Sequence, residues 1–280
     1  MPSRALTSPN RDYAMGLARA FAGAIIFGLP LLMTMEMWFL GISLHPGRLL
    51  VFLGVNFLIL AGLSRFGGFE KTDSLGEDVM DALAACGVGI LGAAAVLFLL
   101  AIVGPAMPLD EIAGKIAIQS VPMSFGAMLA RKQLGGGGEE AAEEEAALRG
   151  AGYGGQLFLM AAGALFLSFS VAPTEEMVLL AYMMSPWHLL GLVLLSLLLL
   201  HLLVYRVGFG GQKSHPEGAG TVQTALHYTI PGYGIALAVG LYVLWTFGRI
   251  DGTAIDQVAA TMAVIAFPGA LGAAIARLVV

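Results

Sequence analysis

The sequence contains little charge and almost no cysteine. Only 12% of its 280 residues are Asp, Glu, Lys or Arg, whereas soluble domains carry about 25%. Cys86 is the single cysteine, so neither an intramolecular disulfide nor a site built from several cysteines can form. The shortage of charge argues against a soluble fold, because too few polar side chains are available to cover its surface.

The motifs of common enzymes are also missing. There is no phosphate-binding loop, dinucleotide fingerprint, His-Glu-x-x-His motif or pair of histidines at metal-ligand spacing. A Gly-x-Ser-x-Gly nucleophile elbow is absent, and no basic stripe with interleaved aromatic residues indicates nucleic-acid binding. We therefore expect no enzymatic activity, no catalytic residue, no cofactor, no metal site and no nucleic-acid partner.

Long apolar stretches dominate what is present. Hydrophobic residues make up 58% of the chain and the mean hydropathy is +0.84. A bilayer core of about 30 Å requires roughly 20 apolar residues in a helix. Eight stretches qualify, at about 18–40, 48–64, 79–103, 111–130, 154–177, 187–205, 222–246 and 254–278. We predict an all-α, polytopic membrane bundle of about eight transmembrane helices in contact with a lipid bilayer.

Polar segments separate these stretches into parts. Residues 1–17 lack the short apolar core of a cleavable signal peptide and are predicted to be a cytoplasmic N-terminal segment. Residues 132–152 are rich in Gly and Glu and are predicted to form a cytoplasmic linker. Two membrane parts of four helices each remain, at 18–131 and 153–280.

The two membrane parts have similar sequences. A shift of 140 residues places Thr34 on Thr174 and Glu36 on Glu176, and a shift of 146 places Asp110 on Asp256 and Pro122 on Pro268. This ordered set of polar residues and prolines predicts a tandem repeat. Four crossings per repeat would give both halves the same orientation, whereas a re-entrant fourth segment would invert them.

The distribution of basic residues favours eight crossings. With the N-terminus inside, the cytoplasmic side would hold Arg4, Arg11, Arg65, Lys71, Arg131, Lys132, Arg149, Arg206, Lys213 and Arg277, and the outer side only Arg48 and Arg249. Three crossings per half would move Arg206 and Lys213 outside and remove this asymmetry. We predict a bacterial cytoplasmic (inner) membrane protein with both termini in the cytoplasm.

Two motifs carry a resemblance to a known family. The stretch GLARAFAGAIIFGLPLLMTMEMWFLG at 16–41 and VPMSFGAMLAR at 121–131 resemble a bacterial family of integral membrane proteins of unknown function. The resemblance covers most of the chain and implies membership of the membrane class. It implies no activity and no functional residues.

Acids inside the apolar runs are the first candidates for function. Glu36 and Glu176, with Glu175 beside the latter, lie within long apolar stretches. An ionised carboxylate at the bilayer centre costs at least about 2.5–3.5 kcal/mol, so such acids usually face a cavity or a partner. Glu36 lies roughly 25 Å along its helix from Arg19, so a location at the outer surface remains an alternative.

Prolines near both acids predict helix breaks. Pro30 precedes Glu36 and Pro173 precedes Glu176, and each proline frees a carbonyl of the preceding turn. Thr34 and Thr174 can satisfy such carbonyls or help to coordinate an ion. Broken helices that carry an acid and free carbonyls are how transporters build cation sites.

Five other polar residues in or beside the spans are candidates for a secondary ion pathway, although each also has a more ordinary explanation: Lys115, Asp110, Asp256, His201 and His227. Asp110 and Asp256 each open a helix and complement its dipole. Lys115 can pair with an acid across the bundle, such as Glu36, or reach the interface by its long stem. His201 is expected to hydrogen-bond to a neighbouring helix, with a proton relay as the alternative, and His227 precedes a Pro-Gly break. Asn56 and Ser196 are expected to hydrogen-bond between helices.

The fourth and eighth segments are predicted to be central. Gly126 with Ala130, and Gly272 with Ala276, give faces of small residues that allow close helix approach. Pro122 and Pro268 are expected to bend or break these helices, and a bend that lines a pore is the alternative. Packing of the two segments against each other or across a dimer leaves homo-oligomer formation open.

Two functions follow from these patterns. The first is a membrane transport protein, either an ion channel or a secondary transporter, whose cation or proton path lies between the halves and uses acidic sites in the outer half of the bilayer. The second is a non-conducting scaffold that binds lipid, pigment or a partner membrane complex. An intramembrane enzyme is a third and less favoured alternative.

Overall fold

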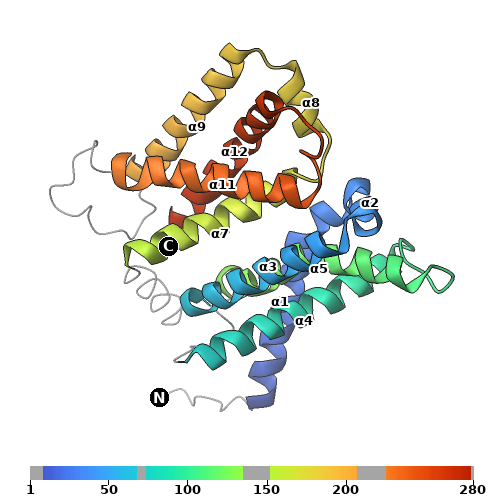
Figure 1. Cartoon of the computed structure of the whole chain (residues 1–280). Helices are drawn as coiled ribbons and strands as arrows, with labels where there is room; N and C mark the ends of the chain where they lie inside the picture. The colour runs from blue at the N-terminus through green and yellow to red at the C-terminus, as the bar shows by residue number, and fades with distance from the viewer. Residues whose placement is uncertain (1–8, 68–73, 135–151, 207–224, 279–280) are drawn as a thin grey trace, which may run out of the picture. The chain divides into compact units, whose positions relative to one another are not determined.

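The structure is a computed structural model that describes residues 9–67, 74–134, 152–206 and 225–278. These residues form ten α-helices and one π-helical turn (Figure 1). Eight helical segments are long and apolar enough to cross a membrane, which confirms the all-α fold and gives eight candidate membrane spans. The predicted linker at 132–152 lies almost wholly outside the described residues, as do the first eight residues of the N-terminal segment.

The chain divides into two compact units, Met1–Glu144 and Glu145–Val280. The helices of the first unit are α1 (Pro9–Leu32), α2 (Met35–Ser43), α3 (Pro46–Gly67), α4 (Leu75–Leu99) and α5 (Leu109–Leu134). The second unit contains α7 (Tyr153–Val171), α8 (Glu176–Met183), α9 (Pro186–Arg206), the π-helical turn η1 (Ala225–Thr229), α11 (Ile230–Thr246) and α12 (Ile255–Leu278).

Each unit begins with a long helix that is broken near its end. In the first unit α1 continues through Pro30 and ends at Leu32, and the short helix α2 starts at Met35. In the second, α7 ends at Val171, and Pro173 lies in the gap before α8. The helix is therefore interrupted just before Glu36 and just before Glu176, although α1 runs through Pro30, so this proline is not itself a helix break.

The last helix of each unit is its most buried span. Within the first unit α5 packs against α1, α2, α3 and α4, and within the second α12 packs against α7, α8, α9 and α11. Both helices continue without interruption through their internal prolines, Pro122 and Pro268, so the prediction that these prolines break the helices is wrong. The fourth and eighth segments are thus central in their own units, as predicted.

Glycines allow the central helices to approach their neighbours. A Cβ on Gly126 of α5 would overlap the backbone of Gly23 in α1, and a Cβ on Gly272 of α12 would overlap the backbone of Gly163 in α7. Such contacts between small residues stabilise membrane helices by close van der Waals packing. The predicted small-residue faces are therefore used inside each unit.

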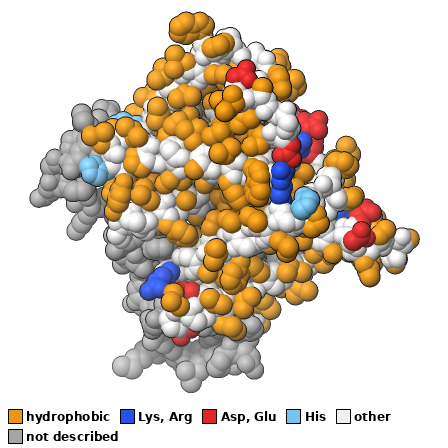
Figure 2. Space-filling view, viewed as in Figure 1, with side chains coloured by type: hydrophobic (Ala, Val, Ile, Leu, Met, Phe, Trp, Pro, Cys, Tyr) orange, Lys and Arg blue, Asp and Glu red, His pale blue; other side chains and the backbone are white. Residues whose placement is uncertain are grey.

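The outward surface of the spans is apolar. Large side chains such as Trp187, Leu194 and Leu198 of α9 are exposed, and Figure 2 shows hydrophobic side chains over most of the visible described surface. In a helix long enough to span a membrane, such side chains face lipid. The molecule is accordingly a multi-pass integral membrane protein.

Candidate functional site

At the first helix break, the side chain of Thr34 forms a hydrogen bond to a carbonyl at the end of α1. This residue has an extended backbone and precedes α2 as its N-cap. Its backbone N–H and its hydroxyl both donate to the carbonyl of Leu31, at 3.1 and 2.7 Å. The indole N–H of Trp38 donates to the carbonyl of Leu32 at 2.6 Å. Two carbonyls that the end of α1 leaves free therefore receive donors from within the break.

A fully buried amide on α5 reaches the same break. Gln119 donates from Nε2 to the carbonyl of Leu31 at 3.5 Å, across 88 residues of sequence. Its other amide atom, Oε1, is buried without a hydrogen-bond partner within the part of the chain that the structure describes. A buried acceptor of this kind costs about 1–3 kcal/mol unless a donor or a cation satisfies it. The side chain that contacts the end of α1 thus also carries a buried oxygen without a donor.

Glu36 lies in the first turn of α2, directly after this break. Its side chain is half-buried, and no described residue forms a hydrogen bond or ion pair with it. The partial positive charge at the helix N-terminus favours a carboxylate here. Local sequence therefore puts the acid at the break, and its own side chain remains available to a ligand. We call Leu31, Thr34, Glu36 and Gln119 the first break site.

The second break has a similar backbone but different surroundings. Thr174 donates from N and Oγ1 to the carbonyl of Val171, at 3.1 and 2.9 Å, as Thr34 does in the first unit. Glu176 lies in the first turn of α8 and is exposed. The residue at the position matching Gln119 by the 146-residue shift is Ile265, which is fully buried. No buried amide is therefore available at this position.

Arg249 binds both a carbonyl and a carboxylate at the second break. The guanidinium group donates to the carbonyl of Pro173, and it forms an ion pair with Glu175, with 3.6 Å between Nη1 and Oε1. Only 17% of the Arg249 side chain is exposed, compared with 82% for Glu175. The arginine therefore serves mainly to hold the break to the loop between α11 and α12.

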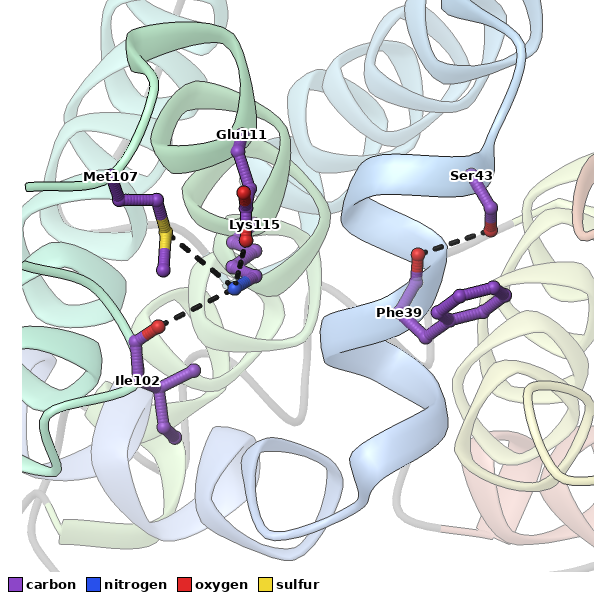
Figure 3. A network of polar contacts seen from close by, with 6 residues as sticks. All are labelled: Phe39, Ser43, Ile102, Met107, Glu111 and Lys115. Atoms are coloured by element: carbon purple, nitrogen blue, oxygen red, sulfur yellow. Dashed lines mark hydrogen bonds and ion pairs between the residues drawn. The ribbon is translucent and has the colours of Figure 1, made fainter.

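Lys115 binds an acid of its own helix. Its ammonium lies 2.7 Å from Oε1 of Glu111, one turn earlier on α5. The carbonyl of Ile102 and the thioether of Met107 complete its contacts, at 3.4 and 3.6 Å (Figure 3). The structure thus satisfies the side chain without the Glu36 pairing considered from the sequence.

The remaining candidate residues have local roles. Asp110 and Asp256 lie in the first turns of α5 and α12 and are exposed. His201 on α9 lies 2.9 Å from the hydroxyl of Thr229 in η1, so its predicted bond to a neighbouring element is confirmed. His227 also lies in η1, where its carbonyl accepts a hydrogen bond from Tyr153.

The two polar residues expected between helices behave differently. Asn56 on α3 donates to the hydroxyl of Ser124 on α5 at 3.2 Å, which confirms its predicted interhelical bond. Ser196 is buried but donates to the carbonyl of Leu192 on its own helix. That second prediction is wrong, because a serine in a helix can always reach the carbonyl one turn earlier.

Family comparison decides the class of the protein. Residues 16–280 match the family described as "Putative integral membrane protein (DUF2391)". The chain belongs to this family. Its match covers both units and confirms the resemblance found in the sequence, and the family's function is unknown. No curated protein and no solved structure matches this DUF2391 chain.

Two groups of functional interest in this family member were missed from the sequence. Gln119 is not among the residues singled out from the sequence, although it is the single Gln within its apolar span and lies one turn beyond Lys115. Arg249 was assigned only to an outer loop. Among the residues that the structure describes, no three His, Cys, Asp or Glu side chains come together as metal ligands.

A second polar group lies at the junction of α3 and α4. Ser64 donates to Asp81 at 3.0 Å, and Arg65 lies 3.6 Å from Asp78. Both carboxylates are buried. Asp81 accepts a hydrogen bond from Ser64, and Asp78 forms an ion pair with Arg65. These contacts hold the start of α4 against α3, and the group requires no ligand.

Proposed function

We propose that this protein transports a proton or a small cation across the membrane, with the first break site as the position where the ion is bound. Glu36 would supply the negative charge and the Oε1 atom of Gln119 a neutral oxygen. Thr34 would fix the geometry of the break by donating to the carbonyl of Leu31. The proposal includes a channel or a secondary transporter and does not depend on which of the two operates.

The observation that carries the proposal is the unsatisfied, fully buried amide oxygen of Gln119 at a helix break that also presents a half-buried acid. Buried polar groups are almost always hydrogen-bonded, and an exception calls for a ligand, a water or an ion. In membranes, non-helical backbone is tolerated where it is buried in protein or lines a cavity. A bound ion accounts for both features together.

The second break is assigned a structural role in this proposal. Arg249 supplies a positive charge beside Glu175, and Ile265 removes the buried oxygen. Both features disfavour a cation. The two acids that the sequence presents as a symmetric pair would then have diverged, with ion binding in the first unit and helix closure in the second.

The proposal keeps the tandem repeat and the predicted orientation. The helix order, the two threonine-closed breaks and the glycine contacts Gly23–Gly126 and Gly163–Gly272 agree with two copies of one four-span unit. Arg and Lys positions favour both termini in the cytoplasm of a bacterial cell, with the breaks toward the outer leaflet.

A non-conducting scaffold remains the second candidate. The observation that favours it is that Thr34, Trp38 and Thr174 already donate hydrogen bonds to carbonyls at the two breaks. Carbonyls already bound by side chains are poorer ligands for an ion. In that case Glu36 would only complement the dipole of α2.

Flux measurements separate the two candidates. The purified protein is reconstituted in liposomes, and fluxes of H⁺, Na⁺, K⁺ and Ca²⁺ are recorded for the wild type, Glu36→Gln and Glu176→Gln. We expect wild-type flux of at least one ion above that of empty vesicles, lost in Glu36→Gln and kept in Glu176→Gln. Wild-type vesicles that leak no faster than empty ones to any of these ions would contradict transport and favour the scaffold.

A further inference from the structure

Three acceptors of the first unit converge on one ammonium group. The carboxylate of Glu111, the carbonyl of Ile102 and the thioether of Met107 lie 2.7, 3.4 and 3.6 Å from Nζ of Lys115. Figure 3 shows them approaching from the start of α5 and from the loop that precedes it. An ammonium has three N–H donors, so each acceptor can be matched with one donor.

The Lys115 side chain of this group is largely screened from water, and Glu111 is partly exposed. The Lys115 side chain is 9% exposed and that of Glu111 is 25% exposed. On the side of α2, the backbone of α5 is in close contact with Gly41, because a Cβ on Gly41 would lie 2.7 Å from Cα of Lys115. Salt screens such a charge pair only weakly. Removing the ammonium would leave the Glu111 carboxylate without a compensating positive charge.

The composition of the pocket selects the type of cation. A hard ion such as Na⁺ or Mg²⁺ prefers several oxygen ligands, and thioethers bind hard ions poorly. One carboxylate oxygen, one carbonyl and one sulfur at hydrogen-bonding distances instead fit the directional donors of an ammonium. The second unit lacks the arrangement, because Gln257 and Thr261 occupy the positions matching Glu111 and Lys115.

We propose that Glu111, Met107 and the carbonyl of Ile102 form a binding site for a small primary ammonium ion, which Lys115 fills in the native protein as a tethered occupant. The tethered ammonium holds the loop at 100–108 against the start of α5. Removing the lysine leaves a vacant ammonium site that a soluble amine can enter. This inference goes beyond ion transport and does not depend on it.

The test is chemical rescue of Lys115→Ala. The substitution removes three methylenes and the ammonium, and n-propylammonium restores the same atoms. Thermal unfolding of the purified full-length protein in detergent is followed with and without this amine. We expect n-propylammonium to raise the melting temperature of Lys115→Ala by about 2–4 °C, the shift typical of moderate saturation of a single site, and to leave the wild type unchanged.

Matched controls separate the ammonium site from a simple cavity. Propan-1-ol has a similar size without the charge, so it should not raise the melting temperature of Lys115→Ala, and neither should NaCl at equal ionic strength. Lys115→Met fills the space without an ammonium and should not respond to the amine. Equal shifts for alcohol and amine, or no shift with either, would overturn the proposal.

A second comparison covers the case in which Lys115→Ala cannot be purified. Glu111→Gln removes the charge that holds the ammonium, whereas Asp110→Asn makes the same change at an exposed neighbouring residue. We expect a lower melting temperature for Glu111→Gln than for Asp110→Asn. Equal values would show that the pocket does not recognise the charge of Lys115, and the proposal would fall.

Failure of this inference and failure of the proposed transport are distinguishable. Rescue is read from thermal unfolding, and transport is read from flux through vesicles. A protein that conducts no ion can still show rescue by n-propylammonium, and a conducting protein can fail to show it.

Discussion

Gly41 of α2 and Gly114 of α5 are in direct backbone contact. A Cβ on Gly114 would overlap the carbonyl oxygen of Gly41, and a Cβ on Gly41 would lie 2.7 Å from Cα of Lys115. The short helix after the first break is thereby held against the central helix of its unit. This contact fixes the direction in which the chain continues past Glu36.

Gly114→Ala is expected to destabilise the protein. The added methyl meets backbone, which cannot move aside as a flexible side chain can, and overpacking of this kind costs about 1–3 kcal/mol. The melting temperature in detergent measures the effect. Gly54→Ala on α3 is the matched control, since nothing lies within 4 Å of a Cβ at that position, and it should not lower the melting temperature. Equal behaviour of the two variants would disprove the close contact.

Ser124→Ala should weaken the contact between α3 and α5. The change removes the acceptor of the buried Asn56 amide, and Oδ1 of Asn56 already lacks a partner within the described ranges. Interhelical hydrogen bonds in membranes contribute about 0.6 kcal/mol on average and up to ~1.7. Thermal unfolding of Ser124→Ala should show a free energy of unfolding that is lower than that of the wild type by an amount in this range.

Ser43→Ala serves as the control for that measurement. Its hydroxyl is exposed and donates to the carbonyl of Phe39 on the same helix (Figure 3). We expect no resolvable change in melting temperature. A drop equal to that of Ser124→Ala would mean that the Asn56–Ser124 bond contributes nothing specific.

Gln119→Leu is expected to reduce transport strongly without unfolding the protein. The substitution removes the neutral oxygen of the first break site, and hydrogen bonds to charged groups are worth about 1.5–3 kcal/mol, so the flux should fall about tenfold or more. Leu at this site resembles the buried Ile265 of the second unit, and the fold should tolerate it. The liposome flux assay, with Ile265→Leu as control, checks this. Unchanged flux in Gln119→Leu would show that the Gln119 amide is not part of the ion path.

Arg249→Met should destabilise the second unit more than Glu175→Gln does. The arginine is largely buried and donates to the carbonyl of Pro173, and a buried acceptor left without its donor costs about 1–3 kcal/mol. Glu175 is 82% exposed, so water screens its ion pair and the expected loss is only about 0–1 kcal/mol. Comparison of the two melting temperatures tests the order. The reverse order would mean that the ion pair, and not the carbonyl, holds the loop.

Several features of the fold were predictable from local sequence. The apolar lengths predicted the eight spans, because the thickness of the bilayer fixes how many helical residues must be apolar. Pro30, Pro173 and the two threonines predicted the breaks before Glu36 and Glu176, because a break depends on residues within one or two turns. The small-residue face around Gly126 likewise predicted a central helix.

Partners of the polar side chains were not predictable in the same way. The sequence suggested that Lys115 pairs with an acid across the bundle, such as Glu36, or reaches the interface, whereas the structure pairs it with Glu111 of its own helix. Gln119 and Leu31 are 88 residues apart, and no short pattern in an apolar sequence indicates that they meet. Membrane helices can pack in many rotations with similar apolar contact, so the positions of a few polar groups depend on the final packing.

The sequence by itself determined that this chain is an α-helical, multi-pass membrane protein whose first and fifth spans break beside an acid, since these properties follow from apolar length and from local proline and threonine chemistry. Only the tertiary structure decided that the two breaks differ. It placed a buried amide with a free oxygen at the first break and an arginine at the second, because the rotation and contacts of α5 and of the loop before α12 determine which side chain reaches each broken helix.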